Sequence, residues 1–211
     1  MSELDILAFL DESNKPMRDA ATGRVAPSLG HYVVAAAIVL RGESAAMRTE
    51  LRSLVGSVGH ELHYSALSTR RRTAALTGIA EIDGWEGQLY ETRTPLPAHR
   101  PEQRTRARIL TVALADLTNR RGVRLVTLET RASPKKGFTT LDLNDHAIWR
   151  SLLDRGLVPS GRAIAHDDKS EPLLWLADLL AGARSDYVCG AERRMFPLVA
   201  HRISRVTAVD G

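Results

Sequence analysis

Phe9-Leu10-Asp11-Glu12-Ser13 lies near the start of the chain, and near its end the sequence reads Asp167-Asp168-Lys169-Ser170-Glu171-Pro172-Leu173-Leu174-Trp175-Leu176-Ala177-Asp178-Leu179-Leu180-Ala181-Gly182. Both segments place acidic side chains where the apolar pattern predicts a core. The first ends an apolar strand with an acidic pair. In the second, Asp178 shares a helical stripe with Leu174, Ala177 and Ala181, because residues three and four apart lie on one face.

Buried acids need a physical explanation. An unpaired carboxylate in apolar surroundings is strongly disfavoured, so each one requires a cation, hydrogen-bond donors or a metal ion. A divalent metal ion shared between the two segments would satisfy several carboxylates at once.

Length and composition predict one globular domain over residues 1–211, with 44% of the residues apolar. The single cysteine, Cys189, excludes an internal disulfide framework and a cysteine-based zinc site, and it fits a reducing cytoplasm. The N-terminus is acidic, and the longest apolar run, at residues 32–40, is far shorter than the roughly 20 residues of a membrane span. We therefore expect a cytoplasmic protein without a membrane anchor.

The formal net charge of +4 is modest for a chain of this size and does not by itself indicate a nucleic-acid partner. Basic clusters would follow phosphates if they shared one face, although solvated helix faces explain them equally well. The clusters are Arg70-Arg71-Arg72, Arg100 with Arg104, Arg106 and Arg108, Arg120-Arg121, and Arg131 with Lys135-Lys136. Nucleic acid is thus one candidate partner, and the sequence sets no oligomeric state.

Hydrophobic periodicity predicts strands that precede helices and then alternate with them. Strands are expected at residues 4–10, 31–40, 61–64, 85–94, 123–129 and 163–166 and near Val206, and helices at residues 43–55, 67–79, 101–119, 141–153 and 172–185. Residues 14–30 are rich in turn formers and are expected to form a long connection. This order predicts an α/β fold with a mixed sheet covered by helices on both faces.

If the strands that end at Asp11 and Glu129 lie side by side and parallel, two carboxylates meet at one edge of the sheet, where α/β proteins usually place their sites. Asp178 and Asp168 would approach the same edge. Hard divalent cations such as Mg²⁺ and Mn²⁺ prefer such oxygen ligands. Two of these ions about 4 Å apart activate water and stabilise the leaving oxygen in phosphodiester cleavage.

Three motifs occur in a characteristic order along the chain. They are Phe-Leu-Asp11-Glu12-Ser13-Asn14, the pair Leu62-His63, and Asp168-Lys169-Ser170 followed by Leu174-Trp175-Leu176-Ala177-Asp178-Leu179. Their order and spacing resemble the domain-of-unknown-function group 3800, whose members begin with a strand ending in Asp-Glu-Ser-Gly and finish with a short acidic segment and a Leu-Gln-Leu-Ala-Asp-Leu helix. This chain departs from that pattern at Asn14 and Trp175.

The resemblance implies a ribonuclease-H-like fold in which acids on the first strand, on a later central strand and on the last helix hold the catalytic metals. Asp11 and Asp178 match these places by motif, whereas Glu129 rests on the strand prediction. Asp168 is a further expected ligand, with Asp167 as a near-equal candidate. Glu12 is a second-line ligand, since neighbouring strand residues alternate faces. His63 could position water, donate a proton or bind a phosphate oxygen.

Each candidate also has a purely structural explanation. Asp11 could be a turn residue at a strand end, and Asp168 could start the following helix through local hydrogen bonds. Asp178 could form a buried ion pair with an arginine, and Glu129 could pair with the nearby arginine at the surface. An isolated histidine such as His63 is more often structural.

Three functions remain open. The first is a divalent-metal-dependent nuclease that uses Mg²⁺ or Mn²⁺ to hydrolyse RNA or DNA. The second is a noncatalytic ribonuclease-H-like module that binds nucleic acid or a protein. The third is a metal-dependent hydrolase of a small phosphorylated metabolite. Aromatic residues make up only 5% of the chain, which weakens the prediction of a base-stacking platform for single strands.

Overall fold

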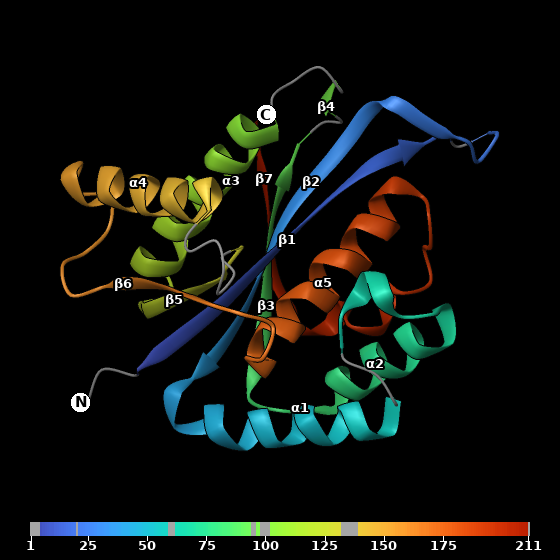
Figure 1. Cartoon of the computed structure of the whole chain (residues 1–211), viewed down its shortest axis with the longest axis horizontal. Helices are drawn as coiled ribbons and strands as arrows, with labels where there is room; N and C mark the ends of the chain where they lie inside the picture. The colour runs from blue at the N-terminus through green and yellow to red at the C-terminus, as the bar shows by residue number, and fades with distance from the viewer. Residues whose placement is uncertain are drawn as a thin grey trace.

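A computed structural model describes residues 5–19, 21–58, 62–93, 96–97, 102–131 and 139–210 of the chain. Its centre is a seven-stranded mixed sheet with the order β6-β5-β1-β2-β3-β7, and β4 pairs with β2 (Figure 1). The strands are β1 (Ile6–Arg18), β2 (Val25–Leu40), β3 (Trp85–Thr92), β4 (Leu96–Pro97), β5 (Val123–Glu129), β6 (Ala163–Asp167) and β7 (Ile203–Val209).

The first three strands form an antiparallel meander, and the later strands add to both of its sides. β5 pairs with β1 in parallel, with Leu128 beside Leu10, and β6 pairs with β5 in parallel. β7 pairs with β3 in parallel at the other edge. The predicted side-by-side arrangement of the first strand and the strand ending at Glu129 is therefore confirmed.

Helices cover both faces of the sheet, as predicted. α1 (Ser44–Val58), α2 (Thr69–Glu81) and α5 (Pro172–Cys189) pack on one face, and α3 (Glu102–Asn119) and α4 (Thr140–Asp154) pack on the other. Short 3-10 turns occur at Arg41–Glu43, Tyr64–Ala66, Phe196–Leu198 and Ala200–Arg202. Among the residues described, no helix has the length and apolar character needed to cross a membrane.

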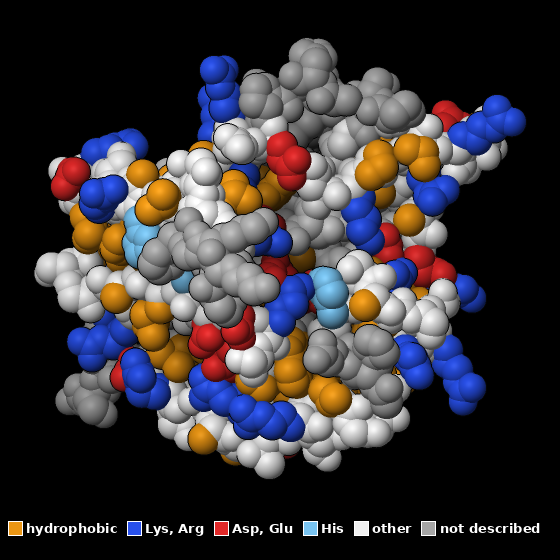
Figure 2. Space-filling model, in the orientation of Figure 1, with side chains coloured by type: hydrophobic (Ala, Val, Ile, Leu, Met, Phe, Trp, Pro, Cys, Tyr) orange, Lys and Arg blue, Asp and Glu red, His pale blue; other side chains and the backbone are white. Residues whose placement is uncertain are grey.

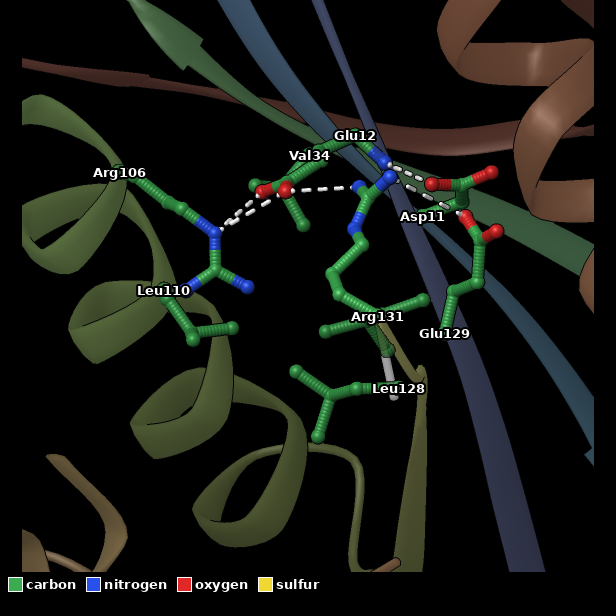
Figure 3. Close-up of a pocket in the computed structure, with 9 residues that line it drawn as sticks. Asp11, Glu12, Val34, Arg106, Leu110, Leu128, Glu129 and Arg131 are labelled. Carbon is green, nitrogen blue, oxygen red and sulfur yellow. Dashed lines mark hydrogen bonds and ion pairs between the residues drawn. The ribbon is translucent and has the colours of Figure 1, made fainter. Parts of the chain in front are cut away.

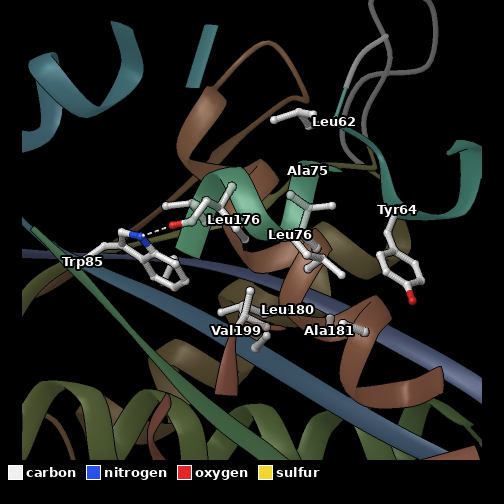
Figure 4. Close-up of a cluster of buried hydrophobic side chains, with 14 of the residues drawn as sticks. Leu62, Tyr64, Ala75, Leu76, Trp85, Leu176, Leu180, Ala181 and Val199 are labelled. Carbon is white, nitrogen blue, oxygen red and sulfur yellow. Dashed lines mark hydrogen bonds between the residues drawn. The ribbon is translucent and has the colours of Figure 1, made fainter. Parts of the chain in front are cut away.

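α5 lies directly across β1 and β2, because both surfaces carry small residues. Ala35 and Ala37 of β2 and Ala181 and Gly182 of α5 are buried, and small side chains allow a close approach. Figure 4 shows Leu176, Leu180 and Ala181 of α5 in the cluster that also holds Leu76 and Val199. The helix begins after Glu171, whose side chain accepts the Leu173 N–H, and it ends at Gly190 in the left-handed conformation with φ 75°.

The pleat of β1 divides its side chains between the two cores. Leu7 and Phe9 belong to the core beneath α5, whereas Ala8 and Leu10 belong to the core beneath α3 and α4. Since side chains alternate along a strand, Asp11 projects toward α5 and Glu12 toward α3. Two neighbouring acids thus enter two different environments.

The prediction of a long connection over residues 14–30 is wrong. β1 continues past Asp11 to Arg18, and β2 starts at Val25, so a long hairpin replaces the expected loop. Pro16 is accommodated because the register shifts between it and Met17, and such an irregularity tolerates a residue without an N–H. The turn itself is short, and the Asp19 carboxylate accepts the Ala21 and Thr22 N–H groups there.

The prediction of a short strand at residues 61–64 is also wrong for the residues that the structure describes, 62–64. Leu62 and His63 are outside any strand, and Tyr64 begins a 3-10 turn. The Tyr64 N–H donates to the Asp178 carboxylate instead of to another strand. Residue 61 lies outside the described residues.

A buried ion pair fixes α5 to β3, and we expect its loss to destabilise the fold. Burial opposes ionisation of Glu91, but hydrogen bonds from Arg184 and His31 outweigh it and lower its pKa to about 2. This carboxylate therefore stabilises the fold above the ordinary glutamate pKa, and the contribution disappears as the pH falls toward 2. Glu91→Gln should reduce the free energy of unfolding by about 2 kcal/mol at pH 7.

Urea denaturation at pH 7 and at pH 2.5 measures this effect. The difference between Glu91→Gln and the wild type should shrink at the lower pH. Asp210→Asn is the control, because Asp210 and its partner Arg93 are both largely exposed and such pairs contribute little. Equal stability of Glu91→Gln and the wild type at pH 7 would contradict the prediction.

Candidate functional site

Three carboxylates from distant parts of the sequence converge at one pocket. Asp11 comes from the middle of β1, Glu129 from the end of β5, and Asp178 from the middle of α5. All three line a hollow together with Leu62, His63, Lys169, Leu174 and Trp175. Asp11 and Glu129 also line an adjoining hollow with Glu12, Arg106 and Arg131 (Figure 3).

Asp11 is the most buried of the three, with 6% of its surface exposed. Its carboxylate accepts the N–H of Glu12 at 2.6 Å. Burial, followed by the negative charges of Asp178 and Glu129, raises the pKa of Asp11 well above its ordinary value. The ionised form of Asp11 is therefore disfavoured with the side chains as they stand.

Asp178 has better hydrogen-bond partners. It accepts the Tyr64 N–H at 2.6 Å, and His63 Nδ1 lies 3.0 Å from its Oδ2 atom. Burial alone would raise the pKa of Asp178, but the bonds from His63 and Tyr64 outweigh burial and lower it. The partner of this mid-helix acid is thus a histidine, rather than the arginine of the structural alternative.

Glu129 faces two cations. Lys169 Nζ lies 3.4 Å from its Oε1 atom, and Arg131 Nη1 lies 3.9 Å from its Oε2 atom. Only 9% of the Glu129 side chain is exposed, so this is not the surface ion pair of the structural alternative. Figure 3 shows Arg131 reaching between Glu129 and Glu12.

The donor set of this pocket fits a hard divalent cation, since it consists of carboxylate oxygens around a buried, poorly compensated Asp11. As the side chains stand, however, no three acidic, histidine or cysteine groups in the described part of the chain form a closed metal-binding arrangement. Positive charge beside the carboxylates comes from the Lys169 ammonium group and the Arg131 guanidinium group.

Glu12 does not line the three-carboxylate pocket, where a metal ligand would be needed. Its carboxylate accepts bonds from the Tyr32 hydroxyl at 2.6 Å, from Arg106 Nε at 2.7 Å and from Arg131 Nη2 at 3.0 Å. Arg106 also pairs with the buried Asp145. The reason is the strand pleat, which directs Glu12 to the opposite face from Asp11.

Asp168 and Asp167 also remain outside the three-carboxylate pocket. Asp168 is exposed, and its carboxylate accepts the Ser170 N–H at 2.8 Å. Asp167 accepts the Asp168 N–H at 2.9 Å. Both side chains thus organise the turn before α5, which is the structural role considered for Asp168.

Within the described residues, several arginines of the basic clusters are paired with acids or buried. Arg72 pairs with Asp186, Arg120 with Asp116, and Arg121 with Glu86. Arg106 is buried. Arg100, Lys135 and Lys136 lie outside the described residues. Figure 2 shows basic, acidic and histidine side chains close together near the middle of one face.

Sequence reasoning missed three parts of this site. The Tyr64 N–H and the Lys169 ammonium group contact the predicted acids, and the Trp175 indole lines the pocket and donates to the Lys169 carbonyl at 2.7 Å. Lys169 and Trp175 both stand inside the motif that carries Asp178, which is a signal that could have indicated them. A backbone N–H leaves no such signal.

Comparisons with known proteins support the fold. No family model and no curated protein matches the chain, so the resemblance to group 3800 stays a prediction. Among solved structures, the chain is similar to the RNase HII in the complex of PCNA with RNase HII from Archaeoglobus fulgidus. The two are 16% identical, the match covers 90% of this chain and 78% of the other, and the TM-score is 0.50. The chain has a ribonuclease-H-like fold.

Removal of the Asp11 charge should stabilise the protein without metal. The pKa of Asp11 is raised on folding, so its ionised form destabilises the fold at pH values above that raised pKa, and the penalty disappears as the pH falls toward 4. We expect Asp11→Asn to melt at a higher temperature than the wild type in EDTA at pH 8, with a smaller difference at pH 5. A lower melting temperature for the variant at pH 8 would refute this account of the pocket.

Proposed function

We propose that this protein is a divalent-metal-dependent nuclease that hydrolyses phosphodiester bonds in RNA or DNA. The observation that carries the proposal is the meeting of Asp11, Glu129 and Asp178 at one pocket, where burial and like charge leave Asp11 in need of a cation. The fold supports it, because the similar solved protein is named an RNase HII. That likeness extends to the fold alone, so the activity rests on the three acids.

In this proposal, Asp11, Glu129 and Asp178 hold Mg²⁺ or Mn²⁺. The bound metal would activate a water molecule and stabilise the leaving oxygen. His63 orients Asp178 through their contact at 3.0 Å, and the Tyr64 N–H fixes the same carboxylate. Arg131 lies on the adjoining side of the pocket, where its charge would attract a phosphate group.

One observation favours the noncatalytic alternative. The Lys169 ammonium group lies against Glu129 and His63 and supplies positive charge to the carboxylates without a metal. A noncatalytic ribonuclease-H-like module that binds nucleic acid or a protein would therefore need no metal ion to balance these carboxylates. Metal titration and cleavage assays separate the two functions.

The decisive assay incubates the purified protein with labelled single-stranded, duplex and hybrid RNA and DNA, in Mg²⁺, in Mn²⁺ and in EDTA. Cleavage that requires a divalent metal would support a nuclease and identify its substrate class. Metal binding without cleavage of any oligonucleotide would favour the binding module. Release of phosphate from small phosphate esters alone would favour the metabolite hydrolase.

A further inference from the structure

Lys169 occupies an unusual place for a lysine, because its ammonium group lies in the three-carboxylate pocket. Its Nζ atom is 3.4 Å from Glu129 Oε1 and 2.9 Å from His63 Nδ1. Asp11 and Asp178 line the same hollow. This side chain is therefore in position to balance part of the negative charge of the site.

Hydrogen bonds hold the backbone around Lys169. Its carbonyl accepts the Trp175 indole N–H at 2.7 Å, and the neighbouring Asp168 carboxylate accepts the Ser170 N–H. These bonds tie the residue to the start of α5. The side chain is 41% exposed, and its flexible four-carbon stem allows the ammonium group to leave the pocket while the backbone stays in place.

A divalent cation in this pocket would lie close to the Lys169 ammonium group. Both are attracted by the same carboxylates, and two positive charges a few ångströms apart in a partly buried site repel each other strongly. We propose that Lys169 is a resident counter-cation of the Asp11, Glu129 and Asp178 pocket, beside Arg131 at Glu129, and that it competes with the divalent metal for these carboxylates. This inference rests on the metal binding in the proposed function, but it does not require cleavage.

Competition predicts that loss of the ammonium group strengthens metal binding. Lys169→Met keeps most of the length and apolar stem of the side chain and removes its charge. We expect it to bind Mn²⁺ about tenfold more tightly than the wild type, since the metal no longer displaces a bound cation. A purely structural lysine would give unchanged or weaker binding.

Isothermal titration with Mn²⁺ alone, at low ionic strength and neutral pH, tests this inference. Lys169→Arg keeps the charge and should bind Mn²⁺ with wild-type affinity within about threefold. Arg41→Met removes one positive charge at an exposed ion pair with Asp5, outside the residues that line the pocket, and should match the wild type. Melting curves verify that each variant is folded.

Tighter binding by Lys169→Met alone supports the inference. Equal or weaker binding by Lys169→Met overturns it, as does equal tightening in Arg41→Met or the absence of Mn²⁺ binding in every variant. The nuclease proposal can be refuted independently of the competition between Lys169 and the metal. If Lys169→Met binds Mn²⁺ more tightly and the wild type cleaves no oligonucleotide, the competition stands and the nuclease proposal falls.

Discussion

Replacement of Asp11 by asparagine is expected to reduce the rate of nucleic-acid cleavage at least about a thousandfold, which corresponds to roughly 4 kcal/mol of transition-state stabilisation. The reason is that Asp11 is the most buried of the three acids and interacts with the negative charges of both others. Asp178→Asn should lose activity to a similar extent. Single-turnover cleavage of the best substrate in saturating Mn²⁺ measures both effects.

Asp168→Asn is the matched control for these two variants. It removes one carboxylate from the same sequence motif as Asp178, but its side chain is exposed and bonds to the Ser170 N–H. Asparagine also accepts such a bond, so we expect near wild-type cleavage. Full activity of Asp11→Asn, or a loss in Asp168→Asn as large as in Asp11→Asn, would show that the site has been assigned to the wrong acids.

Replacement of Gly182 by alanine should destabilise the fold by about 3 kcal/mol, the upper part of the usual range for overpacking. A Cβ atom at this position would lie 2.3 Å from two ring atoms of Tyr64. That ring is buried, and its hydroxyl donates to Asp186. Tyr64 cannot move away freely, and any shift would also disturb its N–H bond to Asp178. Urea denaturation measures the loss.

Gly56→Ala provides the control within another helix. Gly56 lies in α1, and a Cβ atom there would meet no other atom within 4 Å. Because alanine favours helix more than glycine does, this variant should be more stable by about 0.5–1 kcal/mol. If both substitutions stabilise the protein, the close packing of Gly182 against Tyr64 is wrong.

Most of the secondary structure could be predicted from the sequence, because the spacing of apolar residues indicates which side chains are buried. The strand over residues 123–129 and the helices that became α3, α4 and α5 carry strong apolar patterns between recognisable caps. The long hairpin could not be predicted in this way. Its strands contain Pro16 and Gly30, and cross-strand pairing overrode the turn preference of these residues.

The places of the three acids could be predicted from the elements that carry them. Asp178 stands on a buried helical stripe, and Asp11 and Glu129 follow from parallel strands that pair. The partners of Asp178 depend on how a loop folds against α5, which local sequence does not specify. Asp168 lies outside the pocket, and a short polar turn gives no indication of where its side chains point.

The alternation of Asp11 and Glu12 between the two faces of the sheet also restricts insertions and deletions within β1. Loss of one codon between those for Ile6 and Leu10 would exchange the faces of the two acids, with Glu12 turned toward α5 and Asp11 toward Arg106. The three-carboxylate pocket and the Glu12–Arg106 ion pair would both be lost, although both acidic side chains would still be present. Insertions and deletions are therefore expected at the hairpin turn near Asp19 and not within β1. An alignment of related chains should cross this strand without a gap.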